Sequence, residues 1–265
     1  MILFLLFIVV IAVYQTFDML RAIIVFFFKD QLARLLLFRN LNARSKKYLE
    51  GVFVFYQNLR PKDKKFFERR VQKFIDMKEF VPRGELKQVT LEMKTLIAAS
   101  AIQITFGLPA IYMRTFYRIL IYPDDYYSTI THRYHRGEVN TRGFIVLSWS
   151  NLVEGYADNT DGRNLGLHEM AHALKIVDAF HSEEQNFFDR KTFMQFINHA
   201  RAEMARMEMG EESFFRDYAA TNDHEFFAVA VENFFERPRE FRDYHPELYE
   251  LLGELLNQQP EPAPL

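Results

Sequence analysis

His168-Glu169-Met170-Ala171-His172 is the stretch that determines how the rest of this chain is interpreted. On an α-helix, two residues four positions apart lie one turn above each other on nearly the same face, so two imidazoles can converge on one metal ion. Glu169 follows the first histidine, where it can reach a water molecule on the metal and take its proton as the water attacks a carbonyl. The pattern therefore predicts the metal-binding helix of a hydrolytic enzyme.

The residues around this motif favour a buried helix. Four apolar side chains accompany the histidines, as expected for a zinc helix in a protein core: Leu165, Leu167, Ala171 and Leu174. The alternative is a solvated helix whose two histidines bind no metal. The chain contains no cysteine, so any metal must be held by His, Asp or Glu.

A catalytic zinc needs three protein ligands and an open position for water, so a third ligand is required. Asp178 fits a metzincin-like arrangement, but that arrangement needs a glycine where this chain has Lys175. His181 would need a looser loop. Glu225, near the start of a later predicted helix, would complete a gluzincin-type site, and its spacing from the preceding asparagine also suits a helix capping box. Glu232, two turns further along the same face, competes as a ligand or as a partner of a ligand.

Length and charge limit the class of protein. With 265 residues, of which 49% are hydrophobic, the chain can form one large domain with a sizeable core and an appendage. The formal net charge is −2, so the chain has no bulk positive field to attract nucleic acid. We therefore expect no nucleic-acid partner.

Apolar periodicity predicts several helices and a small sheet. Five helices are expected. One begins after Pro61, one spans Leu91–Phe106, one includes the histidine motif, one includes Phe193–Met207, and one runs from Asn222 to Glu236. Strands are expected at Arg118–Tyr122 and Phe144–Trp149, with a polar loop from Asp124 to Arg142 between them. The predicted fold class is therefore α+β and predominantly helical.

The first 28 residues predict a membrane anchor. No charged side chain occurs from Met1 to Tyr14, apolar character continues to Phe17, and a second apolar run spans Ala22–Phe28. The alternatives are a buried core helix and a cleaved signal peptide, which needs cationic residues before the apolar stretch and small residues at a cleavage site, both absent here. Lys and Arg follow the anchor and none precede it, so we expect a cytoplasmic catalytic domain.

The rest of the chain divides into three predicted parts. Residues 29–47 are expected to form an amphipathic connector at the membrane surface. Residues 48–257 form the expected catalytic domain. Residues 258–265 contain three prolines and are expected to form a disordered tail.

Five stretches of the chain are distinctive in combination. They are Val146–Trp149, Asp161–Leu165, His168–His172, Asp217–Asn222 and Glu225–Val229. Together, over about residues 48–249, they resemble the Mlc titration factor A family of zinc-dependent peptidases. The resemblance implies a zincin-like, gluzincin-type metallopeptidase domain related to the catalytic domain of anthrax lethal factor. It also implies Zn²⁺ as cofactor and a peptide or protein as substrate, and leaves open whether cleavage is aminopeptidase-like or internal.

The resemblance assigns roles to individual residues. It implies that His168, His172 and Glu225 bind zinc, that Glu169 is the general base, and that Tyr218 steadies the oxyanion. From the residues alone, a phenol seven positions before a ligand can donate to developing negative charge. The competing interpretation of Tyr218 is a core tyrosine whose hydroxyl is satisfied elsewhere.

The chain also departs from the family pattern. Lys175 stands where the family often has aspartate, so a partner of a ligand is missing or is replaced by Asp178. The apolar N-terminus is absent from the soluble enteric members, so binding to a sugar-regulon repressor is not carried over. The segment Gly143–Trp149 is expected to be either the edge strand that pairs with an extended substrate or a plain core strand.

Two function classes remain from the sequence. The first is a membrane-anchored zinc metallopeptidase that cleaves peptide bonds with a metal-activated water. The second is a membrane-tethered regulatory binding protein that keeps a zinc-stabilised peptidase fold without significant turnover; a protein regulator as partner stays unidentified. Four further histidines show no ligand spacing and are expected to be surface or packing residues: His132, His135, His199 and His245.

Overall fold

The computed structural model describes residues 40–128, 132–180 and 187–260. The predicted membrane anchor, the connector as far as residue 39 and the last five residues of the predicted tail lie outside these ranges, and so does His181. None of the helices within the described ranges is both long enough and apolar enough to cross a bilayer. The residues from Leu41 onward form one unit.

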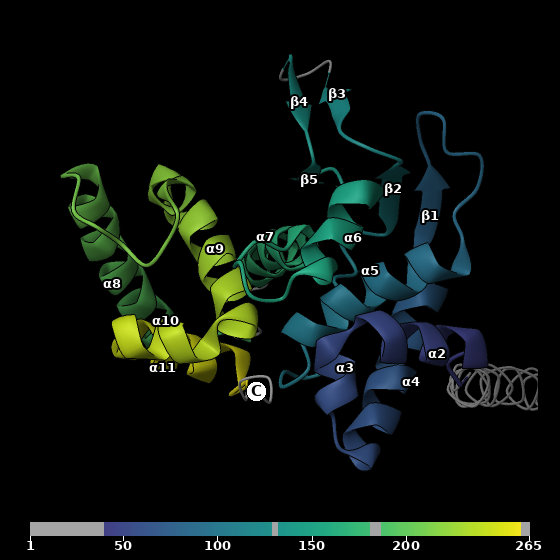
Figure 1. Ribbon diagram of the computed structural model, residues 1–265, viewed down its shortest axis with the longest axis horizontal. Coiled ribbons are helices and arrows are strands. Elements are labelled where there is room, and N and C mark those ends of the chain that lie inside the picture. The colour runs from purple at the N-terminus through teal and green to yellow at the C-terminus, as the bar shows by residue number, and fades with distance from the viewer. Residues whose placement is uncertain (1–39, 129–131, 181–186, 261–265) are drawn as a thin grey trace, which may run out of the picture. The chain divides into compact units, whose positions relative to one another are not determined.

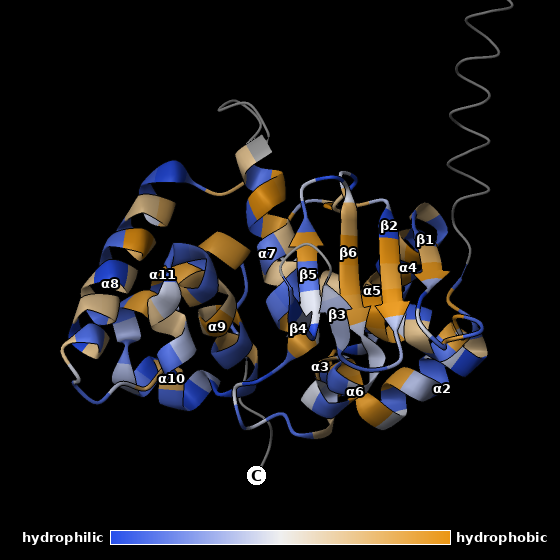
Figure 2. Cartoon of the chain, turned by 90° about the horizontal axis from the view of Figure 1, so that it is seen from above, coloured by the Kyte–Doolittle hydropathy of each residue, from blue (hydrophilic) through white to orange (hydrophobic). Residues whose placement is uncertain are grey.

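A four-stranded sheet forms from the apolar runs predicted as strands and two further segments. Its order is β1 (Glu79–Pro82), β2 (Arg118–Tyr122), β6 (Phe144–Ser148) and β5 (Gly137–Asn140). β1, β2 and β6 are parallel, whereas β5 pairs with β6 antiparallel. β2 and β6 are largely hydrophobic (Figure 2), because strands between two neighbours need apolar side chains to bury.

Of the two alternatives for Gly143–Trp149, the core strand is confirmed, because β6 lies inside the sheet between β2 and β5, and β5 is an edge strand. The prediction of a polar loop from Asp124 to Arg142 was wrong. The predicted polar loop contains β5 and the hairpin of β3 (Tyr126–Ser128) and β4 (Arg133–His135). These strands are short and carry polar side chains, so they show no apolar run, and only their pairing identifies them. Trp149 begins a helix because the Ser148 side chain caps it.

The fold is predominantly helical around this sheet. The helices are α2 (Ala43–Val52), α3 (Val54–Asn58), α4 (Pro61–Met77), α5 (Leu91–Ile104), α6 (Trp149–Ala157), α7 (Leu165–Phe180), α8 (Arg190–Glu208), the 3₁₀ turn η1 (Asp217–Thr221), α9 (Asp223–Glu236), α10 (Pro238–Tyr244) and α11 (Pro246–Leu256). The predicted helices after Pro61, at Leu91–Phe106, across the motif, along Phe193–Met207 and at Asn222–Glu236 are therefore confirmed, with ends shifted by a few residues at most positions.

Helix α7, which carries the two histidines, lies between two groups of helices (Figure 1). It contacts α5, α6 and the strands β5 and β6 on one side and α9 on the other. α5 is buried along almost its whole length, and α9 is buried from Phe226 to Phe234. The histidine motif therefore lies at the centre of the core and not on a solvated helix.

Candidate metal centre

The start of α7 is fixed by one asparagine. Oδ1 of Asn164 accepts from the backbone N–H of Leu167 at 3.0 Å, and its carbonyl accepts from that of His168 at 2.9 Å. At its second residue, α7 approaches α5 so closely that a Cβ atom at Gly166 would lie 2.6 Å from the hydroxyl of Ser100. A capped, tightly packed helix holds the two histidines in a fixed orientation.

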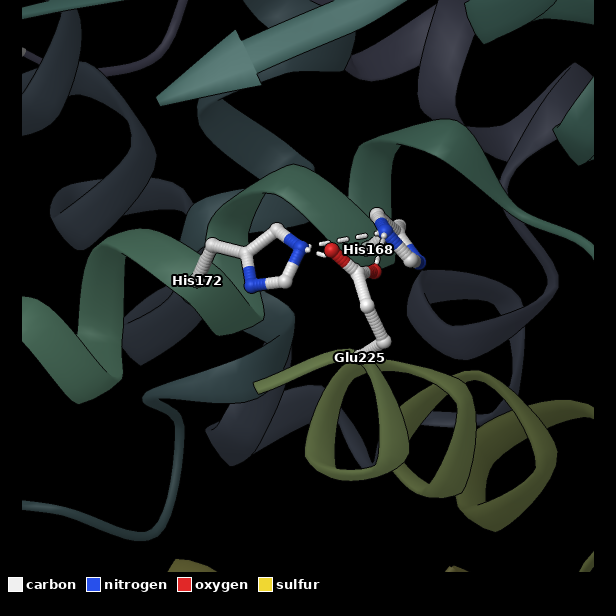
Figure 3. A group of neighbouring side chains, drawn as sticks. All are labelled: His168, His172 and Glu225. Carbon is white, nitrogen blue, oxygen red and sulfur yellow. Dashed lines mark hydrogen bonds and ion pairs between the residues drawn. The ribbon is translucent and has the colours of Figure 1, made fainter. Parts of the chain in front are cut away.

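Three side chains converge between α7 and α9 (Figure 3). The Nε2 atoms of His168 and His172 lie 3.1 Å apart. Oε2 of Glu225 lies 3.1 Å from the first and 3.3 Å from the second. One ligand atom from each of the three residues lies within 4.8 Å of the others, a spacing that lets all three bind one metal ion.

Glu225 reaches this position because α9 begins just before it. The Asn222 side chain caps α9 by accepting from the backbone N–H groups of His224, at 2.8 Å, and Glu225, at 3.1 Å. The capping spacing seen in the sequence is therefore real. It does not compete with the metal site, because the cap uses the backbone of Glu225 and leaves the carboxylate facing the histidines.

Glu232 holds His168 from the opposite side. Its Oε1 lies 2.7 Å from Nδ1 of His168, and its Oε2 accepts from the backbone N–H of Asn164 at 2.7 Å. Arg216 donates to both oxygens, at 2.7 and 3.2 Å. A carboxylate on the second ring nitrogen orients an imidazole ligand, so the structure favours the partner interpretation of Glu232 over the ligand interpretation.

Glu169 is buried against the edge strand. Only 5% of it is exposed, and its Oε2 has no hydrogen-bond partner among the described residues. A Cβ atom at Gly137 in β5 would lie 2.4 Å from Oε1 of Glu169, so this carboxylate fits only because position 137 is glycine. Burial raises the pKa of Glu169.

Tyr218 enters from η1 and lies beside the first histidine. The centroids of the Tyr218 and His168 rings are 5.9 Å apart, and 49% of the tyrosine is exposed. Burial of its hydroxyl and the nearby charge of Glu225 raise the pKa of Tyr218 to about 12, which keeps the hydroxyl protonated and able to donate. This exposure argues against the alternative of a core tyrosine.

Negative charge gathers at the centre. Burial lowers the pKa of His168, but hydrogen bonds to Glu225 and Glu232 outweigh it and raise that pKa to about 10. Burial would raise the pKa of Glu225, but the two imidazoles hold it well below its ordinary value. The cluster therefore attracts positive charge. Two imidazole nitrogens and one carboxylate oxygen, with a buried second carboxylate beside them, fit a divalent transition metal with an open position.

A comparison with known proteins agrees with this geometry. The sequence pattern of a family described as glucose-regulated metallo-peptidase M90 matches residues 28–256. The chain belongs to this family. The match includes both histidines, Glu169, Tyr218 and Glu225, so the family extends over the whole site.

The individual relatives have low sequence identity to this chain. An uncharacterized protein of Synechocystis sp. is 27% identical over 214 residues, which cover 75% of this chain and 78% of the relative. Mlc titration factor A of Pectobacterium atrosepticum is 25% identical over 209 residues, or 71% and 76% of the two chains. The protein of the same name from Escherichia coli O1:K1 is 25% identical over 211 residues, or 71% and 77%. The resemblance to the Mlc titration factor A family is therefore confirmed.

Lys175 binds the start of the second helix. Its Nζ donates to the carbonyl of Asp223 at 2.9 Å and lies over the rings of Phe193 and Phe227. Asp223 is the first residue of α9, two positions before Glu225. Lys175 thus ties the histidine helix to the helix that supplies the glutamate.

The metzincin-like alternative for the third ligand is not supported. Oδ1 of Asp178 accepts from the backbone N–H groups of Phe187 and Phe188, at 3.1 and 3.2 Å. The aspartate thereby fixes the chain leading into α8. Among the described residues, Asp178 is not in the group of side chains that could hold a metal.

The four other histidines that the sequence left aside lie outside this group as well. His135 stacks on Tyr126, and His245 stacks on Phe215. These two contacts agree with packing roles, whereas His132 and His199 are exposed.

Sequence reasoning missed Arg216, Asn164 and Gly137. Arg216 directly precedes the Asp217–Asn222 stretch, and Asn164 ends the Asp161–Leu165 stretch, so both lie in or beside segments that carried the family resemblance. Gly137 gave no signal, because its role depends on a pairing of strands that the sequence does not show.

Proposed function

We propose that this M90-family protein is a zinc-dependent peptidase. His168, His172 and Glu225 hold the zinc ion, Glu169 is the general base, and Tyr218 stabilises the oxyanion. The observation that carries the proposal is the convergence of three ligand atoms within 4.8 Å, two from α7 and one from α9, next to a buried carboxylate.

The donor set supports zinc over other divalent ions. Two imidazoles and one carboxylate, with a fourth position open, are typical of catalytic zinc in peptidases. A zinc ion held there lowers the pKa of a water molecule and polarises the carbonyl of the scissile bond. The helices α7 and α9 with the small sheet would then form a zincin-like, gluzincin-type domain.

Glu169 performs the proton transfers. Its carboxylate accepts a proton from the water that attacks the carbonyl and then delivers that proton to the leaving amine. Its contact with Gly137 supports this role, because the edge strand fixes the carboxylate and keeps bulk water from it. Tyr218 is half-exposed beside His168 and would donate its hydroxyl to the negative charge that develops on the carbonyl oxygen.

The substrate would bind along β5. This strand is the edge of the sheet, and its first residue, Gly137, lies against Glu169. An extended peptide that adds to the free side of β5 would place a carbonyl next to the general base. The substrate would thus pair with β5 and not with β6, for which substrate pairing was one of two alternatives from the sequence.

A cleavage assay on a peptide library tests the function. We expect zinc-dependent hydrolysis that is lost on chelation, restored by zinc and absent from the Glu169→Gln protein. Hydrolysis by Glu169→Gln at the wild-type rate would overturn the peptidase mechanism. The cleavage positions would also show whether the enzyme removes N-terminal residues or cuts internally.

A second candidate function is a membrane-tethered regulatory binding protein. The relatives named Mlc titration factor A favour it, because their name describes titration of another protein. Under this alternative the chain would bind zinc and a protein partner with no significant turnover. Zinc-loaded protein that cleaves no member of the library would favour it.

We also propose that residues 1–28 anchor the protein to a membrane, that 29–47 connect the anchor to a cytoplasmic peptidase domain at 48–257, and that 258–265 form a tail. Full-length protein is expected in the membrane fraction, resistant to high salt and released by detergent. A truncation that begins at Lys46 is expected in the soluble fraction. A secreted protein shortened at its N-terminus would instead support a signal peptide.

A further inference from the structure

The hairpin of β3 and β4 projects beyond the helices (Figure 1) and leads directly into the edge strand. β4 ends at His135 and β5 begins at Gly137, so only Arg136 separates the hairpin from β5. Gly137 is the residue that lies against Glu169. The hairpin therefore begins where the proposed general base meets the sheet.

The root of the hairpin is fixed against the sheet. Tyr126, the first residue of β3, is buried, and its ring stacks on those of Tyr122 and His135, with centroids 4.6 and 6.0 Å apart. Its hydroxyl donates to Oε2 of Glu138 in β5 at 3.5 Å. Burial raises the pKa of Tyr126, and the charges of Glu138 and Glu169 raise it further because both carboxylates are near the phenol. The hairpin thus has a defined position relative to β5 and the general base.

One face of the hairpin is exposed and carries two aromatic rings. Tyr127 and Tyr134 lie opposite each other in the antiparallel pair, with ring centroids 5.4 Å apart, and are 51% and 74% exposed. Arg136 lies two positions after Tyr134, so it continues the same face of the strand, and its side chain is 68% exposed. Its carbonyl accepts from the backbone N–H of Ser148 at 2.8 Å, which extends the pairing of β5 and β6 to this residue. We call Tyr127, Tyr134 and Arg136 the hairpin face.

The chemistry of the hairpin face suits a peptide. Exposed tyrosine rings bury a large area on binding at a low entropic cost, and they are enriched at the centres of interfaces. The guanidinium of Arg136 lies 3.9 Å from Oδ2 of Asp125, and both side chains are exposed. Such a pair contributes little, so the five N–H donors of the arginine can still bind a carboxylate of a partner. The face therefore complements apolar side chains next to an acidic one.

The geometry of β5 brings the substrate to this face. A peptide that pairs antiparallel with β5, the more stable of the two directions, runs from Asn140 toward Gly137. Its residues before the scissile carbonyl then lie along β5. Its residues after the scissile bond pass Gly137 and continue toward Arg136 and Tyr134.

We propose that the hairpin face binds the part of a polypeptide substrate that follows the scissile bond, with an acidic side chain at Arg136 and apolar side chains at Tyr127 and Tyr134. The inference rests on the proposed peptidase function and on substrate pairing with β5. It names the substrate class as polypeptides with acidic and aromatic residues after the cleaved bond. A peptide that ends soon after this bond lacks these contacts.

Fluorescence anisotropy on the zinc-loaded, full-length Glu169→Gln protein measures binding without cleavage. The probes are fluorescein-labelled peptides of four alanines followed by Glu-Phe-Glu-Phe, Gln-Phe-Gln-Phe or Ser-Ser-Ser-Ser. We expect the Glu-Phe peptide to bind about tenfold more tightly than the Ser peptide, with the Gln-Phe peptide between them.

Two variants of this protein separate the rings from the charge. Tyr127→Ser together with Tyr134→Ser should reduce the affinity for the Glu-Phe peptide to nearly that for the Ser peptide. Arg136→Gln should make the affinities for the Glu-Phe and Gln-Phe peptides equal. Tyr244→Ser is the matched control that should change no affinity, because Tyr244 is 69% exposed and lies on α10. Circular dichroism and zinc content establish that the variants keep their fold.

Cleavage by the otherwise wild-type enzyme is the second measurement. Loss of the hairpin rings should raise KM for the Glu-Phe peptide and leave kcat unchanged, because contacts away from the reacting bond act equally on the ground state and the transition state. A preference for the Glu-Phe peptide that survives the double variant, or no preference at all, would overturn the inference while cleavage still supports the peptidase. Preferential binding with no cleavage of any peptide in the library would contradict the peptidase function and would still support the hairpin face as a peptide-binding surface.

Discussion

Glu225 and Glu232 lie seven residues apart on α9, and both contact His168, but at opposite ring nitrogens. Glu225 faces Nε2, and its ion pairs among the described residues are with the two histidines alone. Glu232 faces Nδ1, is 1% exposed, and also pairs with Arg216 and the backbone N–H of Asn164. We call the first the metal face of His168 and the second the anchoring face.

The difference shows that environment and not residue type sets the role of a glutamate. On the anchoring face, protein donors already compensate the carboxylate, so it has no need of a metal and can orient the imidazole. On the metal face, the carboxylate has no cationic partner other than the imidazoles, and a divalent ion would supply that charge.

Loss of the metal-face ligand should have the largest effect. Glu225→Ala leaves two ligands, which rarely suffice for zinc, so the purified protein should contain almost no metal. His168→Ala and His172→Ala should behave in the same way. Elemental analysis of zinc content is the measurement, and Asp178→Ala is the control that should keep about one zinc. Zinc retained in Glu225→Ala but lost in Asp178→Ala would reverse the assignment of the third ligand.

Glu169, the proposed general base, should not be needed for metal binding. Glu169→Gln keeps the size of the side chain and cannot accept a proton, so kcat should fall by about 10²-fold to 10⁴-fold while zinc content persists. Steady-state kinetics on one cleavable peptide, with zinc measured in the same sample, separates the two effects. Loss of zinc together with activity would make Glu169 a ligand and would contradict its proposed role.

Tyr218 should affect the transition state alone. Tyr218→Phe removes only the hydroxyl, so kcat should fall by about 10²-fold with little change in KM, in zinc content or in melting temperature. A fall in stability or zinc content in parallel with kcat would instead make it a packing residue. The exposed Tyr244→Phe is a matched control that should leave kcat unchanged.

Glu232, on the anchoring face, should raise the affinity for zinc without being essential for zinc binding. Glu232→Gln keeps the shape of the side chain but removes its charge, so zinc affinity should fall by about 10-fold to 100-fold, far less than in Glu225→Ala. Competition titration with a zinc chelator measures this change. Complete loss of zinc in Glu232→Gln would erase the distinction between the two faces.

Sequence reasoning was most successful where chemistry is local. The spacing of His168 and His172 depends only on the pitch of a helix, and Glu169 follows from its place beside the first histidine. The helices around them were predictable because buried faces repeat every three or four residues. The polar strands of the edge and hairpin were not predictable, because a short half-exposed strand has no apolar period and is defined by its neighbours.

The amino-acid sequence is enough to predict a helix that carries two histidines one turn apart and to show which family the chain resembles, since a motif on one helix needs no knowledge of the rest of the chain. Residue spacing left Asp178, His181, Glu225 and Glu232 open as further ligands, because each has a local reason, and the family resemblance pointed to Glu225. The three-dimensional packing establishes that Glu225 joins the histidines, that Glu232 contacts the other ring nitrogen of His168, and that Gly137 lies against Glu169. Those contacts join residues far apart in the chain, and the packing of α7 against α9 and of β5 beside α7 brings them together.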